Sequence, residues 1–257
     1  MKQGNDFMVD MLDFDLPESQ NDLLWVAYKP TSAQAVDGDA MLTVPFQAQT
    51  AGMRPLADET ISQRTYRLRL RAYGDVGGGV VLRLSIVFDG DLWEESAMLD
   101  VDPSLDIQPL SVEETTSGWD VLDAGGALRA RITTSEPHTK PWAGMELPPP
   151  QPTLRLTLYP DGDVPVHLAA HDHFFPSKVE SLPLAYVARE GRPHRALFSF
   201  AAELGECFVG TGERFAKLDL SGRTLTLENT DALGVNNRRA YKNVPFYLSS
   251  RPYGLFL

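Results

Sequence analysis

Short runs in which apolar and polar residues alternate recur along this chain, and they constrain its fold more than any other feature. Residues 66–73 read Tyr-Arg-Leu-Arg-Leu-Arg-Ala-Tyr, and residues 80–88 resume the alternation after three consecutive glycines. A period of two places successive side chains on opposite faces of an extended chain, which is typical of a half-buried β-strand. The two runs therefore predict a β-hairpin with a flexible glycine connection.

The alternation returns several times, while helical periodicity is weak throughout. The further runs are 127–132, 153–159, 195–200 and 223–228. Turn sequences such as Pro-Asp-Gly-Asp at 160–163 lie between them, and the chain contains 19 Pro and 20 Gly that can end strands. Many short strands separated by turns predict an all-β fold, a sandwich rather than an alternating α/β protein.

Residues 137–152 form the segment that is rich enough in proline to be considered a domain linker. Alternating sequence flanks it on both sides, so we interpret it as a long surface loop. We therefore predict one continuous sandwich over residues 46–257, with residues 1–45 as an irregular lead-in or as edge strands.

Charge and cysteine content exclude several functions. The formal net charge is −12, and phosphates would repel such a chain, so we expect neither nucleic acid nor a membrane as a partner. The sequence has no apolar run long enough for a transmembrane helix, and its acidic start is unlike a signal peptide. Cys207 is the only cysteine, which favours a cytoplasmic location. We interpret Cys207 as a small buried apolar residue rather than a nucleophile.

Two local patterns resemble ligand sites, and both are incomplete. His171 and His173 would share one face of a strand, but a zinc site needs further ligands, and no recognised spacing supplies them. Gly210-Thr211-Gly212 begins like a dinucleotide loop, but Phe215 stands where the third glycine is required. These glycines instead indicate close strand packing or a positive φ. We expect no metal and no cofactor.

Two acidic positions near the end of the chain leave alternatives open. Glu213 next to Arg214 indicates a buried ion pair at a corner of the sandwich. A catalytic carboxylate is the other reading, and it would need a second carboxylate at about 5–5.5 Å or about 6.5–9.5 Å for glycoside hydrolysis. Asp231 lies in a polar, turn-rich stretch, typical of an exposed loop on a rigid scaffold, where composition alone describes it as a solvated turn residue.

Three motifs follow one another at close spacing in the last fifty residues. Residues 210–215 read Gly-Thr-Gly-Glu-Arg-Phe, residues 229–231 read Asn-Thr-Asp, and residues 240–251 read Ala-Tyr-Lys-Asn-Val-Pro-Phe-Tyr-Leu-Ser-Ser-Arg. Together they resemble the N-terminal domain of glycoside hydrolase family 31, which contains α-glucosidases and α-xylosidases. The resemblance is dense over residues 206–257, with looser similarity at 68–75 and 97–105.

The resemblance implies a galactose-mutarotase-like β-supersandwich placed before a (β/α)₈ catalytic barrel. It also implies a retaining mechanism with two aspartates, one as nucleophile and one as acid/base, both in the barrel. The barrel signature of the family, Trp-x-Asp-Met-x-Glu, does not occur in this sequence. No catalytic residue is therefore assigned to this chain, and we expect the chain alone to be inactive.

One substrate contact is implied by the resemblance. In the family, the aspartate of the Asn-x-Asp loop reaches over the barrel mouth to the sugar in the first subsite, and Asp231 occupies that position. A carboxylate can accept charge-assisted hydrogen bonds from sugar hydroxyls, which makes the role chemically sensible. Thr230 and Arg239 are further candidates for the same rim. The implied substrate is an α-linked oligosaccharide or glycoside.

Two other functions remain open at this point. A stand-alone carbohydrate-binding module could stack sugars on the tryptophans, which are Trp25, Trp93, Trp119 and Trp142. An aldose 1-epimerase uses the same fold, and it would need a histidine acid and a glutamate base in one cleft. His171 or His173 with Glu213 would be the candidates for that reaction.

The sequence ends inside an apolar run, Tyr-Gly-Leu-Phe-Leu at 253–257, and we expect a larger protein to continue there. A domain that packs on its own catalytic barrel should expose an apolar surface at the junction. The expected contributors are Phe246, Tyr247, Tyr253, Leu255 and Phe256. Through the same surface the chain alone could form a homo-oligomer.

Overall fold

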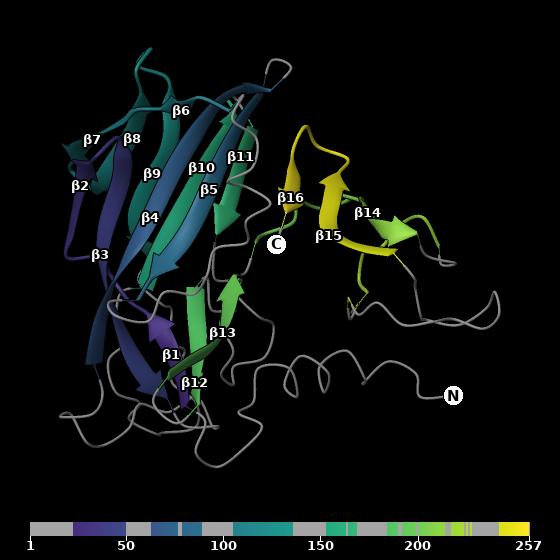
Figure 1. The fold of residues 1–257 in the computed structure, drawn as a ribbon, viewed down its shortest axis with the longest axis horizontal. Coiled ribbons are helices and arrows are strands. Elements are labelled where there is room, and N and C mark those ends of the chain that lie inside the picture. Colours follow the sequence, from purple (N-terminus) through teal and green to yellow (C-terminus); the bar gives the residue numbers. More distant parts are fainter. Residues whose placement is uncertain are drawn as a thin grey trace. The chain divides into compact units, whose positions relative to one another are not determined.

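The described part of the chain consists of β-strands, turns and loops, without a helix. The structure is a computed structural model, and it describes residues 23–49, 63–76, 79–88, 105–135, 153–162, 164–168, 184–189, 192–198, 200–213, 217–223, 225, 227 and 242–256. The predicted all-β fold is confirmed (Figure 1). The chain divides into two compact units, Asp15–Ala201 and Ala202–Leu257 with Met1–Phe14, a division that the alternation pattern does not reveal.

The larger unit contains an antiparallel sheet of eight strands. Their bounds are β1 Leu23–Ala27, β2 Ser32–Val36, β3 Asp39–Gln49, β4 Gln63–Val76, β5 Gly79–Val87, β6 Ile107–Gln108, β12 Leu184–Arg189 and β13 Arg192–Phe198. The order across the sheet is β13-β12-β1-β3-β4-β5, while β2 pairs with β3 and β6 pairs with β4.

A second sheet of the same unit is a five-stranded antiparallel meander. Its strands are β7 Leu110–Thr115, β8 Gly118–Asp123, β9 Leu128–Ser135, β10 Thr153–Asp161 and β11 Val164–Leu168, in the order β11-β10-β9-β8-β7. β5 lies against β10, and β2 and β3 lie against β7, so the two sheets form the layers of a sandwich (Figure 1).

The period-two runs mark the strands well. The predicted hairpin is β4 and β5, with Arg67 opposite Val87 and Tyr73 opposite Val81. The alternation explains the burial: Leu68 and Leu70 are at most 1% exposed, because they point into the sandwich. The runs at 127–132, 153–159 and 195–200 correspond to β9, β10 and β13.

The strand predicted at 223–228 is wrong for the residues described there. Arg223, Leu225 and Leu227 lie outside the strands. The Arg223 amide donates to the carbonyl of Leu220, and the chain turns here. Asp219 accepts hydrogen bonds from the amide and the hydroxyl of Ser221, a local turn that competes with strand pairing.

The first 45 residues were expected to be an irregular lead-in or edge strands, and the described part of them is regular. β1 lies between β12 and β3, and β3 lies between β1 and β4. β3 also runs from Asp39 to Gln49, across the predicted boundary at residues 45 and 46. β1 and the start of β3 are therefore interior strands with buried side chains, among them Trp25, Val26, Leu42 and Val44, whereas β2 is exposed and pairs with β3 alone among the described strands.

An aromatic cluster holds one end of the large sheet together. Trp25 is stacked on Tyr186 with ring centroids 5.9 Å apart, and Phe46 meets the edge of Tyr186 at 5.2 Å. Tyr66 and Phe88 extend the cluster across β4 and beyond the end of β5, with ring centroids 4.7 Å apart. Such aromatic pairs stabilise a core beyond the area that they bury.

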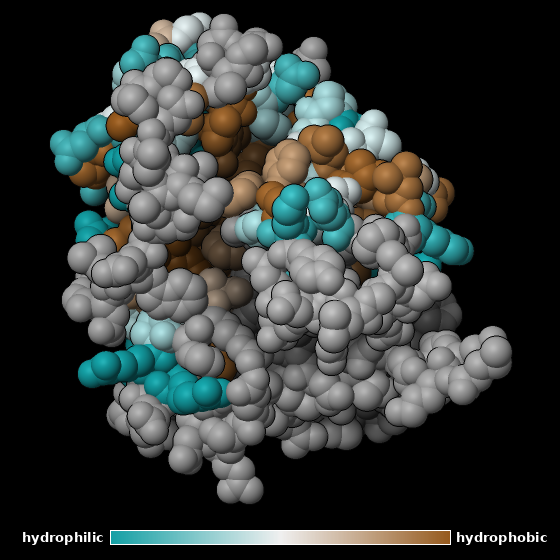
Figure 2. All heavy atoms as spheres, turned by 45° about the vertical axis from the view of Figure 1, so that its right-hand side comes forward, coloured by the Kyte–Doolittle hydropathy of each residue, from teal (hydrophilic) through white to brown (hydrophobic). Residues whose placement is uncertain are grey.

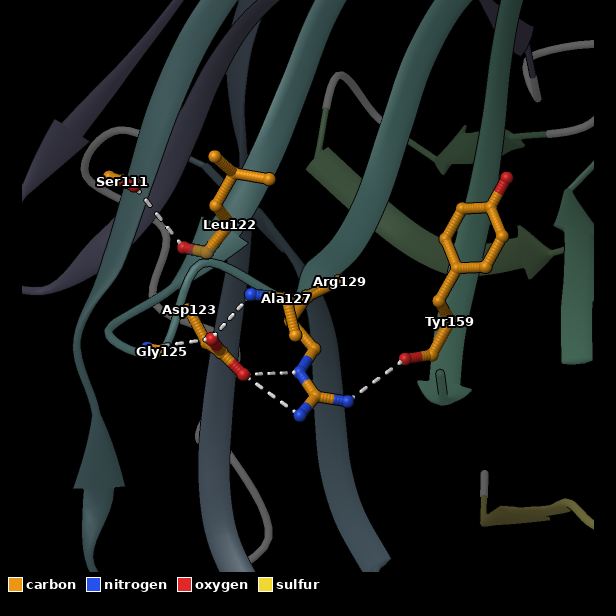
Figure 3. Close-up of polar contacts among 7 residues, drawn as sticks. All are labelled: Ser111, Leu122, Asp123, Gly125, Ala127, Arg129 and Tyr159. Atoms are coloured by element: carbon orange, nitrogen blue, oxygen red, sulfur yellow. Dashed lines mark hydrogen bonds and ion pairs between the residues drawn. The ribbon is translucent and has the colours of Figure 1, made fainter. Parts of the chain in front are cut away.

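Polar side chains stabilise the hairpin between β8 and β9, as Figure 3 shows. Asp123 ends β8, and its Oδ1 accepts the amides of Gly125 and Ala127, both at 2.9 Å. Its Oδ2 pairs with the guanidinium of Arg129, which also donates to the carbonyl of Tyr159 in β10. One carboxylate therefore fixes the turn and connects it to the neighbouring strands.

The smaller unit contains a three-stranded antiparallel sheet. Its strands are β14 Phe208–Glu213, β15 Lys242–Ser249 and β16 Gly254–Phe256, with β15 in the centre. Phe208 pairs with Ser249 at one end of the sheet, and Glu213 pairs with Lys242 at the other. The chain leaves β14 after Glu213 and re-enters the sheet at Lys242.

Candidate functional site

The candidate site is the segment that connects β14 to β15. The predicted sugar contacts Thr230, Asp231 and Arg239 lie outside the described residues, between Leu227 and Lys242. Arg214 and the histidines 171 and 173 also lie outside them. The described frame of the site is therefore the β14–β15 pair and the turns next to it.

Glu213 and Lys242 form an exposed ion pair at the end of this frame. The Nζ of Lys242 lies 3.4 Å from the Oε1 of Glu213, and the two side chains are 72% and 76% exposed. The expectation of a buried pair at Glu213 is therefore wrong. The strand carries this carboxylate out of the sheet into solvent, where an ion pair contributes little stability.

The glycine interpretation of residues 210–212 is confirmed. Gly210 and Gly212 have φ values of 128° and 90°, which side chains disfavour. A Cβ on Gly212 would lie 2.0 Å from the carbonyl oxygen of Lys242, so the strands approach too closely for any other residue. Thr211 between them also has a positive φ, 65°, and is buried.

A buried carboxylate next to β14 is a feature that the sequence analysis missed. Glu206 is 8% exposed, and its Oε1 accepts the hydroxyls of Ser249 and Tyr253. Its Oε2 accepts the amide of Glu203 at 2.7 Å. We call Glu206, Ser249 and Tyr253 with the Glu203 amide the Glu206 clamp. Its partners lie 43 and 47 residues away, so no local pattern could have identified it.

The clamp keeps Glu206 ionised. Burial of the carboxyl would raise its pKa, but the hydrogen bonds from Ser249, Tyr253 and the Glu203 amide outweigh it and hold the pKa below its usual value. Burial and the Glu206 carboxylate raise the pKa of Tyr253, so its hydroxyl remains a donor. Burial likewise raises the pKa of Tyr247 to about 12.

Glu206 and Glu213 do not form a glycosidase carboxylate pair. Glu206 lies two residues before β14 and Glu213 ends it, and the five residue steps of the strand alone span roughly 17 Å at about 3.3 Å per residue. Glycosidase pairs need about 5–9.5 Å. A buried, ionised carboxylate that already accepts three hydrogen bonds is also unsuited to general acid catalysis.

Cys207 is exposed, so its interpretation as a buried apolar residue is wrong. It lies on the turn before β14, where its amide donates to the Ser250 hydroxyl and its carbonyl accepts the Ser250 amide. The neighbouring Glu206 takes the buried position, and the Cys207 thiol contacts the carbonyl of Gly205 at 3.8 Å.

One face of the three-stranded sheet is apolar and partly exposed. Cross-strand pairs share a face, so Val209 lies beside Leu248, and Phe246 lies beside Phe256. Val244, Leu248 and Phe256 are 43%, 48% and 39% exposed. Figure 2 shows hydrophobic surface at its upper right, on the side where Figure 1 draws β15 and β16.

This apolar face differs from the expected one in its members. Of the five expected contributors, Phe256 is exposed and Phe246 lies on the same face. The prediction that Tyr253 contributes to the exposed apolar surface is wrong, since its hydroxyl donates to Glu206 and its side chain is buried. Tyr247 and Leu255 pair on the opposite face, and the ring of Tyr247 lies against Phe208.

The other candidate ligand sites receive no support within the described residues. There, no cluster of three or more His, Cys, Asp or Glu side chains could hold a metal ion. A search of the same residues found no helix suited to crossing a membrane. Trp25 is 1% exposed between Tyr186 and Arg64, so it offers no face to a sugar, whereas Trp119 in β8 is half-buried. Trp93 and Trp142 lie outside the described residues.

Comparisons with known proteins show the family of the chain. The profile of the glycosyl hydrolase 31 N-terminal galactose mutarotase-like domain matches residues 81–257. An α-xylosidase of Emericella nidulans is 43% identical over 54 residues, and the α-xylosidase XylQ of Lactiplantibacillus pentosus is 41% identical over 54 residues. Each match covers 21% of this chain and 7% of the enzyme.

Among solved structures, the cycloalternan-forming enzyme of Listeria monocytogenes, in complex with a pentasaccharide substrate, aligns with 94% of this chain and 24% of its own length. The sequence identity is 14% and the TM-score is 0.35.

Proposed function

This chain belongs to the family of glycosyl hydrolase 31 N-terminal galactose mutarotase-like domains, and we propose that it forms the substrate rim of a retaining α-glycosidase. It is a domain associated with glycoside hydrolases. In the proposal, the chemistry takes place in a catalytic barrel of the same protein, and this domain contributes one loop to the sugar subsite. We call the protein that contains both parts the full-length enzyme.

The observation that carries the proposal is the family match, which includes the whole β14–β15 region. The segment between Leu227 and Lys242 contains Asp231, which we propose as a direct contact to a sugar hydroxyl. An ionised carboxylate binds hydroxyl donors strongly and in defined directions, which suits recognition of a sugar. Thr230 and Arg239 would supply further polar groups to the same rim.

The names of the relatives suggest the first substrates to test. Both matched enzymes are α-xylosidases, so α-xylosides come first and α-glucosides second. The matches cover a small part of those enzymes, so the substrate of the full-length enzyme is part of this proposal.

We propose that the catalytic barrel packs on the apolar face defined by Val209, Val244, Phe246, Leu248 and Phe256. Partly exposed apolar side chains gathered on one sheet face are typical of an interface. The amides of β15 and β16 should then exchange more slowly in the full-length enzyme than in this chain alone. Equal exchange rates would contradict this docking.

The chain alone should not hydrolyse glycosides, because the proposal places both catalytic aspartates in the barrel, whose signature does not occur in this sequence. The measurement compares the 257-residue chain with the full-length enzyme on aryl α-xylosides and aryl α-glucosides. We expect turnover by the full-length enzyme and none above background by the chain. Turnover by the chain would contradict the proposal, and so would tight binding of xylo- or malto-oligosaccharides to it in calorimetry.

A further inference from the structure

The strand next to the Glu206 clamp specifies its own register poorly. β14 contains two glycines, Gly210 and Gly212, and its pairing with β15 shifts between them. Glycine-rich strands have few side chains that fix a register, so they are prone to slip. A slip of one residue would move Lys242 by about 3.3 Å and turn the apolar face of β15 to the opposite side.

The clamp connects the two segments whose alignment sets this register. Glu206 lies two residues before β14, Ser249 ends β15, and Tyr253 directly precedes β16. The amide of Ser250 donates to the carbonyl of Cys207 at 2.9 Å, and the Ser249 hydroxyl also accepts the amide of Arg251. The turn between β15 and β16 is therefore bonded to the turn before β14 through both side chains and backbone.

A carboxylate at position 206 can select one register, whereas an apolar residue could not. The Ser249 and Tyr253 hydroxyls reach the same oxygen, Oε1, which requires one placement of β15 relative to Glu206. Any other placement would leave a buried carboxylate without its donors, which is strongly unfavourable. Arg251 adds a smaller electrostatic contribution: its guanidinium lies 4.0 Å from Glu203 and over the ring of Tyr253, and its charge helps the hydrogen bonds to lower the pKa of Glu206.

We propose that Glu206 is a positioning residue that fixes the register of β15 against β14, and with it the point at which the chain re-enters the sheet at Lys242. The inference rests on the proposed function, in which residues shortly before Lys242 contact the sugar. Glu206 touches no substrate in this account, and it acts through the strand that follows the sugar-binding segment.

The first test measures amide exchange of residues 242–249 in the 257-residue chain. Glu206→Gln keeps the size of the side chain but replaces one acceptor oxygen with a donor. We expect exchange in β15 to become roughly tenfold to a hundredfold faster, the effect of losing one or two buried hydrogen bonds. The matched control is Glu213→Gln, at the exposed end of β14, for which β15 exchange should stay within about threefold of the parent.

Milder variants keep the test decisive if Glu206→Gln does not fold. Tyr253→Phe and Ser249→Ala each remove one donor to Oε1. Each should accelerate β15 exchange by itself. The acceleration in the double variant should be smaller than the product of the two single-variant accelerations, because both hydroxyls act on one carboxylate. Unchanged exchange in both single variants would overturn the inference, whatever their activity.

The second test separates positioning from general destabilisation in the full-length enzyme. Glu206→Gln should raise KM at least roughly fivefold while kcat changes little, because a displaced rim weakens substrate binding and leaves the barrel chemistry intact. The control is Thr157→Val, which removes the part-buried Thr157–His167 hydrogen bond in the larger unit and should leave KM unchanged. Faster β15 exchange with an unchanged KM would overturn the positioning role.

The two proposals fail in different ways. The sugar contact is tested by the activity of Asp231 variants, whereas the role of the Glu206 clamp is tested by the amide exchange of β15 in the clamp variants. If Asp231→Ala keeps full activity, the proposed function fails, and the functional part of this inference fails with it. If Asp231→Ala is impaired but β15 exchange is insensitive to the clamp variants, this inference alone fails.

Discussion

Replacing Gly212 with alanine should disrupt the pairing of β14 and β15. The φ of Gly212 is 90°, and a Cβ there would lie 2.0 Å from the Lys242 carbonyl oxygen and 2.9 Å from the Val244 nitrogen. Both obstacles are backbone atoms, so the strand itself must move. We expect the unit to lose more than about 3 kcal/mol, since about 1–2 kcal/mol for the left-handed backbone adds to the steric conflict.

Two other glycines separate these contributions. Gly222 lies in the same unit with a φ of 67°, and it has nothing within 4 Å of a Cβ, so Gly222→Ala tests backbone strain alone. Gly79 has neither a positive φ nor a neighbour within that distance. By denaturant unfolding and β15 exchange, the loss of stability on substitution with alanine should be largest at Gly212, smaller at Gly222 and smallest at Gly79. Equal costs at Gly212 and Gly222 would contradict the close approach of the strands.

Replacing Asp231 with alanine in the full-length enzyme should lower kcat/KM by about tenfold to a hundredfold. This is the range expected when a charge-assisted hydrogen bond to the substrate is lost. Asp231→Asn should fall between the parent and the alanine variant, because the amide keeps one acceptor oxygen but loses the charge. Steady-state kinetics on an aryl α-xyloside and an aryl α-glucoside make the measurement.

The matched control for Asp231 is Asp219, an exposed aspartate of the same unit. Its carboxylate is engaged by the amide and hydroxyl of Ser221, at 2.9 and 2.6 Å. Asp219→Asn should therefore leave kcat/KM within about twofold of the parent, as is usual for exposed positions without a substrate contact. If Asp231→Ala behaves like this control, the sugar contact is absent.

The strands could be predicted because their signal is local. Alternation in 66–73 and 80–88 is a direct consequence of side chains that point to opposite faces, and β4 and β5 follow it closely. Of the run at 223–228, the described residues 223, 225 and 227 are not in a strand: Asp219 and Ser221 form a turn directly before them, and the Arg223 amide donates to the Leu220 carbonyl. The alternation of apolar and polar residues does not reveal such a turn.

The Glu206 clamp could not be predicted, because its parts meet only in three dimensions. Nothing around Glu206 distinguishes it from an exposed glutamate, and its burial depends on hydroxyls at positions 249 and 253. The same turn explains why Cys207 is exposed: the chain can bury one of two neighbouring side chains there, and Glu206 has the partners.

Asp231 illustrates the opposite case. Composition gives it no distinction from other turn residues, and its proposed role comes from the family to which the chain belongs. In the proposal, the other residues of the subsite belong to the catalytic barrel, so the surroundings of Asp231 cannot be derived from this domain alone. The described residues contribute the frame, namely the β14–β15 pair and the clamp that fixes it.

In the proposal, the segment between Leu227 and Lys242 contributes to a sugar subsite of the full-length enzyme. The most direct measurement is amide exchange of the full-length enzyme with and without a saturating α-xyloside or α-glucoside inhibitor. We expect slower exchange in residues 228–241 when the inhibitor binds, and loss of this protection in Asp231→Ala at equal occupancy. Protection confined to the barrel, with no change in residues 228–241, would contradict it.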